Sequence, residues 1–260
     1  MYKKEKRTLE RVNVIGVNID AINITNTLAN IEEWIERGEH HYVCVRDVHG
    51  LMECQKDENL RIIHKNSGLT VPDGMPLVWI GRLYGFKNIS RVYGPDLMLE
   101  MCRMSPEKGY THFLYGGKVG VAESLKKNLE NKFLGIDIVG TYTPPFRPLN
   151  EREEEELREQ VGLLKPDLFW VGLSTPKQER FMAEYINKLE TNVMLGVGAA
   201  FDIHTGKIKD APDWIKRIGM QWFFRLLQEP RQLWRRYLYN NPRFIGLAAL
   251  QLLKLRDFKR

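Results

Sequence analysis

The chain has 260 residues, 43% of them hydrophobic and 28% charged, so it can bury a core and is not a disordered segment. Its three cysteines, Cys44, Cys54 and Cys102, are too few for a disulfide framework and favour a reducing compartment. The charged start at residues 1–11 leads into no long apolar run, and the apolar stretch 244–253 is too short to span a bilayer. These features exclude a secreted disulfide scaffold and predict a soluble cytoplasmic protein.

The first half of the chain predicts a mixture of short strands and helices. Alternation over residues 12–17 predicts a strand or hairpin, and apolar spacing over 24–36 predicts a helix. A strand is expected over 41–45 and a helix with one break over 48–64. The segment 71–76 is typical of a turn that leads into an apolar helix ending near residue 84, and a further helix is expected over 95–104.

Strands and helices alternate from residue 111 onward. Strands are predicted over 111–115, 136–139, 167–171 and 193–197, and helices over 119–133, 151–164 and 176–188. This alternation predicts a Rossmann-like, doubly wound, mainly parallel α/β sheet, which binds ligands at the carboxyl ends of its strands. The alternation stops at 206–212. We therefore expect an α/β domain over 1–211 and a basic helical appendage over 212–260.

Positive charge is concentrated in this appendage. The whole chain carries a net charge of +6, whereas residues 212–260 alone hold 11 Lys/Arg and 3 Asp/Glu, together with Trp214, Trp222 and Trp234. Basic residues among aromatics favour an anionic surface, either a membrane or a nucleic acid. An ordinary helical hairpin packed on the body explains the same pattern. No RNA- or DNA-binding motif is present, which favours the membrane over nucleic acid.

Three loops that follow predicted strands have residues suited to a phosphate group. Glycines let the backbone approach an anion, and helix N-termini offer free N–H groups to it. An aspartate can bind ribose hydroxyls or cap a helix, and the glycines can equally form tight turns without a ligand. Three such loops on one sheet edge favour a nucleotide site, formed by Gly116, Gly117, Lys177, Gln178, Gly198 and Asp202.

Acidic residues offer candidates for general-base chemistry. Asp73 lies between a short apolar run and an apolar helix, where its carboxylate could act on a sugar hydroxyl or cap the helix. Asp96 is either first-turn helix charge or a substrate ligand, and His49 either contacts a phosphate or is structural. No Asp-x-Asp, His/Cys cluster or serine nucleophile elbow is present, so we expect no metal and no cofactor. Backbone N–H groups and Arg or Lys would then stabilise the leaving group.

Seven segments together resemble the WecG/TagA/CpsF family of bacterial glycosyltransferases. They occur in order across nearly the whole chain after the first strand, and it is the set rather than any one segment that is specific. The segments are VPDGMPLVW (71–79), RVYGPDLM (91–98), FLYGG (113–117), PPFRPL (144–149), VGLSTPKQE (171–179), GVGAAFDIHTG (196–206) and QEPRQLWRRYL (228–238).

The resemblance implies an inverting, metal-independent transfer of a sugar from a UDP-sugar to a saccharide linked to polyprenyl diphosphate. The enzyme would work at the inner face of the plasma membrane, as a peripheral protein, in teichoic acid, common antigen, capsule or exopolysaccharide synthesis. The resemblance also implies that Asp73 is the catalytic base and that the basic C-terminal segment contacts the membrane and completes the active site. It leaves open whether the donor sugar is N-acetylmannosamine, its uronic acid or glucose, and whether the chain forms a homo-oligomer.

One position departs from the family pattern. Arg46 stands where members often have threonine, and a cation there could hold a diphosphate or a carboxylated sugar. The neighbouring Asp47 is a second candidate base. Arg46 is also the only feature that favours the alternative function, a non-catalytic nucleotide or lipid sensor, because Asp73 is intact. In the appendage, four arginines are expected to bind acidic lipid and to place a cation near the donor diphosphate: Arg225, Arg231, Arg235 and Arg236.

Overall fold

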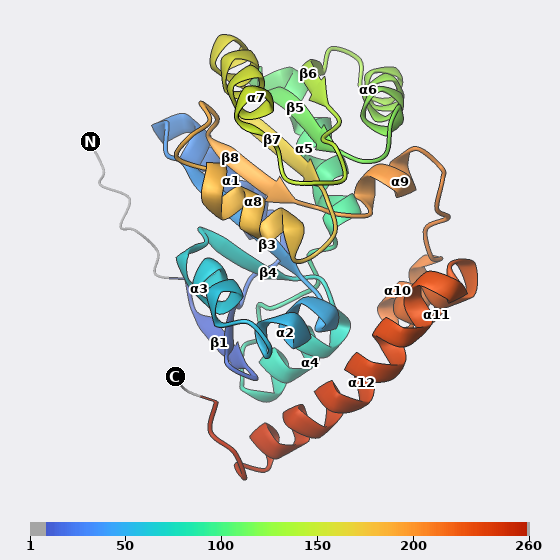
Figure 1. Ribbon diagram of the computed structural model, residues 1–260. Helices are drawn as coiled ribbons and strands as arrows, with labels where there is room; N and C mark the ends of the chain where they lie inside the picture. The colour runs from blue at the N-terminus through green and yellow to red at the C-terminus, as the bar shows by residue number, and fades with distance from the viewer. Residues whose placement is uncertain (1–8, 259–260) are drawn as a thin grey trace.

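The computed structural model describes residues 9–258, so most of the charged start of the chain and the last two cations of the appendage lie outside the described residues. A six-stranded sheet has the strand order β4-β3-β8-β7-β5-β6, and each neighbouring pair in it is parallel (Figure 1). Its strands are β3 (His41–Arg46), β4 (Leu69–Pro72), β5 (Thr111–Gly116), β6 (Asp137–Tyr142), β7 (Leu168–Gly172) and β8 (Val193–Gly196).

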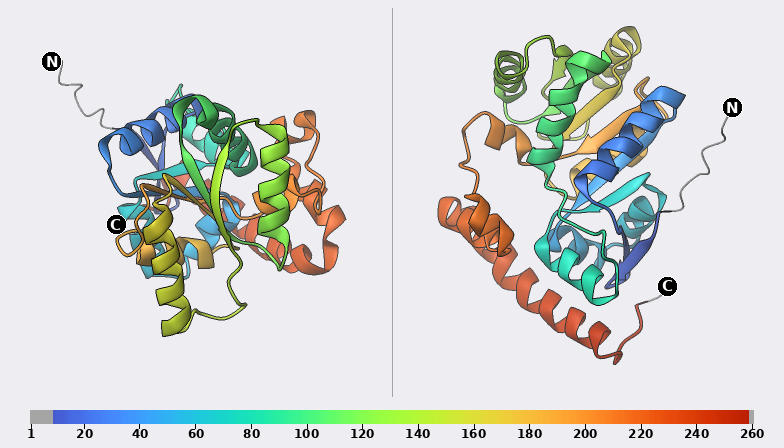
Figure 2. Two further views of the ribbon diagram at one scale, coloured as in Figure 1. Left: turned by 90° about the horizontal axis from the view of Figure 1, so that it is seen from above. Right: turned by 180° about the vertical axis from the view of Figure 1, so that it is seen from behind.

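Helices cover both faces of this sheet (Figure 2). One face buries apolar side chains of α1 (Ile24–Arg37), α5 (Gly94–Lys108) and α6 (Val121–Lys132). The other face buries those of α7 (Glu151–Leu164) and α8 (Lys177–Tyr185). The predicted doubly wound, parallel α/β class is confirmed.

One early prediction needs correction and another is confirmed. Residues 71 and 72, which we expected to begin a turn, instead end the buried edge strand β4, paired with β3 from Val43–Leu69 to Arg46–Pro72. The strand or hairpin predicted over 12–17 is an antiparallel hairpin of β1 (Arg11–Val14) and β2 (Val17–Asp20). The turn between them places Ile15 and Gly16 at positive φ. The expected break in the helix at 48–64 is present between α2 (Val48–Cys54) and α3 (Glu58–Asn66).

Strand ends and helix starts meet at one edge of the sheet. The loop after β4 leads into α4 (Met75–Leu83), and the loop after β8 leads into the short α9 (Ala200–His204). Because all six strands run in the same direction, the loops after β3, β4, β5, β7 and β8 gather at the carboxyl edge. This is the edge where the sequence predicts the site.

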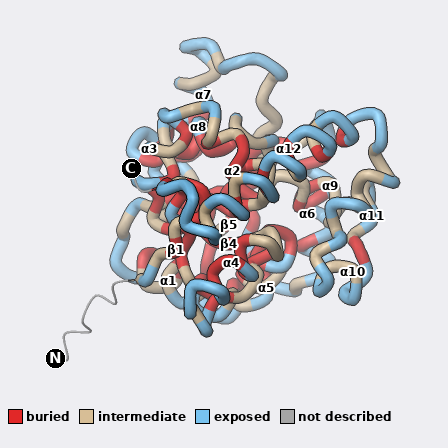
Figure 3. The backbone as a smooth tube through the Cα atoms, turned by 90° about the horizontal axis from the view of Figure 1, so that it is seen from below, coloured by how far each residue is buried: buried red, intermediate tan, exposed pale blue. Residues whose placement is uncertain are grey.

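The appendage folds as three helices that run along this edge and down one side of the molecule (Figure 1). They are α10 (Asp213–Arg217), α11 (Gln221–Gln228) and α12 (Pro230–Leu252). Phe244 and Ala248 of α12 are buried in a cluster with the hairpin, α2 and α4. Much of the remaining surface of these helices is exposed (Figure 3). One face of α12 therefore packs on the body. Within residues 9–258, no helix is both long and apolar enough to cross a membrane.

Candidate active site

Asp73 lies directly after β4, at the carboxyl edge. Its backbone N–H donates to the carbonyl of Arg46 at 2.8 Å, which ties the loop to the end of β3. The carboxylate Oδ1 accepts from Arg91 Nη2 at 2.8 Å and from Arg91 Nε at 3.2 Å. The side chain of Asp73 is 22% exposed, so the carboxylate is partly accessible to solvent. Gly74 is the N-cap of α4, so Asp73 is not a helix cap.

The surroundings of Asp73 make it a stronger base than an ordinary aspartate. Burial raises the pKa of its carboxyl above the usual value; Arg91 opposes the rise and the nearby Asp47 adds to it. Burial penalises the charged form, so the carboxylate gains from accepting a proton. An ionised carboxylate with a raised pKa is suited to remove a proton from a sugar hydroxyl.

Asp47 has a different role in the structure. Its Oδ1 accepts from the backbone N–H of Gly50 at 2.8 Å, which caps α2, and its Oδ2 accepts from Arg236 Nη2 at 2.9 Å. Burial acts to raise the pKa of Asp47, but Arg236 above all, then His49 and Arg46, outweigh it and lower the pKa to about 2. A capping, ion-paired carboxylate with so low a pKa is a poor base, which favours Asp73 for that role.

Arg46 points into the protein interior. Its side chain is 1% exposed and forms an ion pair with the buried Glu179 of α8. Gly50 provides the room, because a Cβ there would lie 2.1 Å from Arg46 Nη1. The expectation that Arg46 contacts a substrate is therefore not supported, because its guanidinium is buried against Glu179. The ion pair instead ties the β3 loop to the start of α8.

Gln178 is buried beside this ion pair. Its Nε2 donates to Glu179 Oε1 at 3.0 Å and to the Gly196 carbonyl at 3.3 Å, and its Oε1 lies 3.4 Å from the position of a Cβ on Gly198. Gln178 therefore contacts the loop after β8 from the protein interior. Lys177 is exposed, and its Nζ lies 4.2 Å from the ring centroid of Phe146.

The glycine loops lie where the sequence places them, but their glycines have structural reasons of their own. Gly116 has φ +128°, and a Cβ there would meet the Gly172 carbonyl at 2.6 Å. Gly117 has φ +77°, and its Cβ would lie 2.7 Å from Val121. Gly198 also has positive φ. Tight turns thus account for these glycines without a ligand, and their role in phosphate binding stays a prediction.

Two other acids lie in first helical turns. Asp96 is exposed in the first turn of α5. Burial of the surrounding region raises the pKa of its carboxyl, and Lys216 of α10 opposes the rise. Asp202 is half-buried in α9, whose N-cap is Ala199, so Asp202 is not the cap that the alternative interpretation required.

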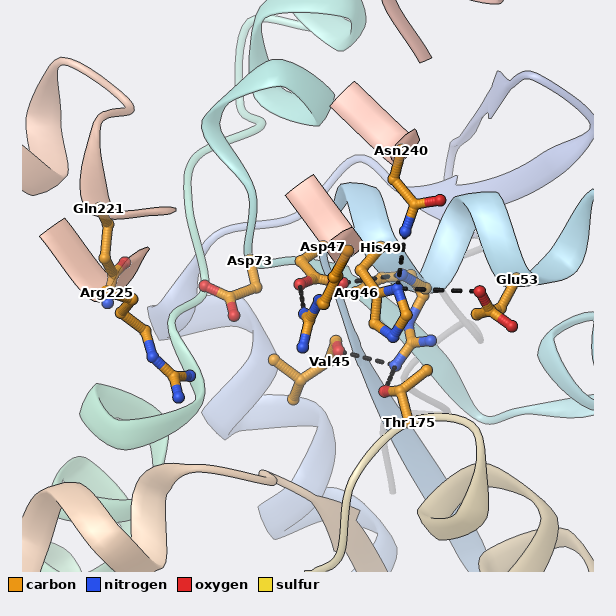
Figure 4. Close-up of polar contacts among 12 residues, drawn as sticks. Val45, Arg46, Asp47, His49, Glu53, Asp73, Thr175, Gln221, Arg225 and Asn240 are labelled. Carbon is orange, nitrogen blue, oxygen red and sulfur yellow. Dashed lines mark hydrogen bonds and ion pairs between the residues drawn. The ribbon is translucent and has the colours of Figure 1, made fainter. Parts of the chain in front are cut away.

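The appendage contributes directly to the surroundings of Asp73 through residues that the sequence analysis missed. Gln221 of α11 accepts from Arg91 Nη2 and donates to the Tyr93 hydroxyl. The guanidinium carbon of Arg91 lies 4.2 Å from the ring centroid of Tyr93. Figure 4 shows Gln221 and Arg225 on one side of Asp73 and Asp47 on the other. Arg91 stands in the matched segment 91–98, which was the available signal for it; nothing local marks Gln221.

The four appendage arginines divide into two pairs. Arg225 and Arg236 are half-buried near the site, and each holds a carboxylate: Arg225 contacts Glu229 at 2.8 Å and Arg236 contacts Asp47. Arg231 and Arg235 are exposed on α12. His49, at the start of α2, interacts through Nδ1 with Asn240 Nδ2 of α12 at 3.0 Å. In the described part of the chain, no group of three or more His, Cys, Asp or Glu side chains is placed to hold a metal ion.

These observations describe an α/β protein with a doubly wound parallel sheet, whose candidate site lies at the carboxyl edge beside the basic helices of the appendage. Residues 12–258 match the family described as "Glycosyl transferase WecG/TagA/CpsF family". The chain belongs to this family and is a glycosyltransferase.

Two relatives share similarity along most of the chain. A protein of Bacillus subtilis (strain 168) named "N-acetylglucosaminyldiphosphoundecaprenol N-acetyl-beta-D-mannosaminyltransferase" is 28% identical over 240 residues, which cover 89% of this chain and 90% of the relative. A protein of the same name from Bacillus spizizenii (strain ATCC 23059 / NRRL B-14472 / W23) is 25% identical over 223 residues, with 85% and 84% coverage.

Proposed function

We propose that this glycosyltransferase moves an N-acetylmannosamine-type sugar from a UDP-sugar to N-acetylglucosamine linked to polyprenyl diphosphate. The names of the two relatives support the acceptor and the transferred sugar. The observation that carries the reaction is the Asp73 carboxylate, which lies at the carboxyl edge, partly open, with a raised pKa.

In the proposed mechanism, Asp73 removes the proton from the acceptor hydroxyl as its oxygen attacks the anomeric carbon of the donor. The bond from that carbon to the UDP oxygen breaks on the opposite side, so the configuration inverts. Arg91 holds the carboxylate in place through Nε and Nη2. Arg225, which has an unpartnered Nε within the described residues, is the appendage cation proposed to approach the departing diphosphate.

The donor would lie across the loops after β5, β7 and β8. The exposed Lys177, the N-terminus of α6 and Asp202 are the groups there that can face a nucleotide diphosphate and its ribose. We infer that catalysis requires no metal, because arginines, lysine and backbone N–H groups can take up the charge of the leaving group.

The appendage would bring this site to the inner face of the plasma membrane. Exposed aromatic and aliphatic side chains alternate with cations along it, among them Trp214, Trp222, Phe223 and Leu227. Such a surface suits reversible binding to anionic lipid, and a lipid-linked acceptor requires it.

Replacement of the base tests the proposal. Asp73→Asn should lower transfer from UDP-N-acetylmannosamine to the lipid-linked acceptor by about 10²–10⁴-fold, because the amide cannot take the proton. Asp137→Asn, an exposed change at the amino end of β6, is the matched control and should leave the rate unchanged. Thermal unfolding and UDP binding should be unaltered in both variants. Near-normal turnover in Asp73→Asn would assign the base elsewhere, with Asp47 the next residue to test.

A further inference from the structure

A groove lies between α2 and α12, next to the proposed active site. Its volume is about 610 Å³, and it is lined by His49, Glu53, Lys56, Trp234, Arg235, Arg236, Leu238, Tyr239 and Asn240. Asp47 lies between Asp73 and His49, so the groove begins where the proposed active site ends (Figure 4). The ion pair of Asp47 with Arg236 marks the boundary.

The lining carries more positive than negative charge. Lys56 contacts Glu53 at 3.0 Å and also faces the Tyr239 ring, with Nζ 5.2 Å from its centroid. Arg235 is exposed and forms no ion pair with any residue of the range 9–258. Glu53 and Asp47 pair with Lys56 and Arg236, so Arg235 is the lining cation that lacks a carboxylate partner in the range 9–258. It favours an anionic ligand, since its guanidinium can bind a phosphate by two parallel hydrogen bonds.

Two buried polar atoms of the lining lack a hydrogen-bond partner among the described residues. One is the Nε donor of Arg236 and the other is the Oδ1 acceptor of Asn240, whose side chain is almost fully buried. Unmet buried groups are costly, and a ligand that satisfies them is favoured. The Arg236 Nε can donate to an anion, and the Asn240 Oδ1 can accept from a hydroxyl. A sugar phosphate carries both groups.

An apolar stripe on α12 begins in this groove. Trp234 and Leu238 line the groove, and Ile245 and Leu252 follow at spacings of 7 and 14 residues from Leu238. At 3.6 residues per turn these four side chains share one face, and all four are exposed. From Trp234 to Leu252 the stripe is about 27 Å long. A nucleotide has no part that needs such a surface, whereas a phosphate on a long hydrocarbon chain does.

We propose that the groove between α2 and α12 binds the diphosphate of a polyprenyl-linked sugar and that the isoprenoid chain lies along the α12 stripe. The inference rests on the proposed function, since it assigns the acceptor of that reaction to this groove. The phosphate contacts Arg235 and Lys56 and competes with Asp47 for Arg236. The sugar then extends past Asp47 towards Asp73.

The test uses the full chain with neutral phosphatidylcholine vesicles that contain or lack polyprenyl diphosphate-linked N-acetylglucosamine. Neutral vesicles remove the general attraction of basic helices to anionic lipid. Flotation measures binding, and transfer kinetics measure the KM for the acceptor. Arg235→Gln should weaken lipid-dependent flotation and raise this KM by about tenfold or more, with the KM for the UDP-sugar unchanged. Arg217→Gln, an exposed change of equal charge on α10, should leave both unchanged.

A second pair of variants tests the stripe. Leu238 is 66% exposed and lines the groove, whereas Leu163 of α7, 85% exposed, does not. Leu238→Gln should raise the KM for the polyprenyl acceptor about fivefold or more and leave that for a short-alkyl sugar diphosphate unchanged, since one exposed leucine contributes about 1 kcal/mol. Leu163→Gln should change neither value.

The outcomes separate this inference from the function on which it rests. Equal losses in Arg235→Gln and Arg217→Gln, or normal acceptor KM in both Arg235→Gln and Leu238→Gln, would overturn the groove while transfer itself stands. Equal recruitment by phosphatidylglycerol, weakened alike by Arg235→Gln, would make the groove a general site for anionic headgroups and also overturn the inference. Lipid-dependent flotation that behaves as expected, without sugar transfer, would support the groove and refute the proposed function.

Discussion

Arg91 and Asp47 carry opposite charges beside Asp73, so removing each one should shift the pKa of Asp73 in opposite directions. Asp73 acts as a base only when ionised, so activity should fall as the pH falls through its raised pKa. Arg91 holds that pKa down, and its removal should raise the pKa further. Arg91→Gln should therefore move the acid limb of the kcat/KM profile to higher pH. Asp47→Asn removes a negative charge and should move the same limb to lower pH.

The structure sets the expected size of each shift. A cation within hydrogen-bond distance lowers a carboxyl pKa by about 1–3 units, and each unit corresponds to about 1.4 kcal/mol. Arg91 contacts Asp73 Oδ1 twice, so its removal should give the larger shift, although both side chains are partly exposed and solvent screens part of the attraction. The shift in Asp47→Asn should be smaller and opposite in direction, because Arg236 already neutralises Asp47.

The measurement is kcat/KM against pH under conditions where the acceptor is not limiting. Asparagine caps helices as well as aspartate does, so Asp47→Asn should keep α2 intact. Arg91→Lys keeps the charge and should restore most of the acid limb. Limbs that shift in the same direction in Arg91→Gln and Asp47→Asn, or that do not move, would refute the assignment of the limb to Asp73.

Four further predictions concern other parts of the chain. Val119, 91% exposed just before α6, lies where a donor diphosphate would meet the helix N-terminus. Val119→Glu should weaken UDP binding in calorimetry about fivefold or more, whereas Val119→Gln should not. Equal affinities of the two variants would exclude this loop from the UDP site. Arg46→Met alone should lower the free energy of unfolding in urea by about 3–5 kcal/mol, because Glu179 is left as an unpaired buried charge, and adding Glu179→Met should recover most of the loss. Replacing the exposed Arg231 and Arg243 of α12 together by Gln should reduce flotation with anionic vesicles about tenfold or more at low salt, at about 1 kcal/mol per cation, and unchanged flotation would exclude their contact with the membrane. Treatment with EDTA should leave transfer unchanged, and a clear loss would show that a metal takes part.

Local sequence signals were sufficient where the responsible contacts are local. The helix predicted over 151–164 matches α7, because Asn150 and Glu153 form a capping box within four residues. The alternating pattern after residue 111 was sufficient for the parallel sheet and for the placement of the glycine loops at one edge. β4 was missed because it has only four residues, ends on Pro72 and is followed by Asp73 and Gly74, and these turn signals are stronger than the strand pattern.

The sequence by itself determined the α/β class, the family resemblance and the basic appendage, because each depends on residues close together in the chain. Through the resemblance it also indicated Asp73 as the candidate base. Only the tertiary structure decided which charges meet. Arg91 reaches Asp73 across 18 residues, Arg236 reaches Asp47 across 189, and Arg46 turns inward to Glu179, 133 residues away. Whether a charged side chain faces a substrate or a buried partner depends on the space and the opposite charge that distant segments bring to it. At Arg46 both come from the fold: Gly50 leaves the space, and α8 supplies the carboxylate.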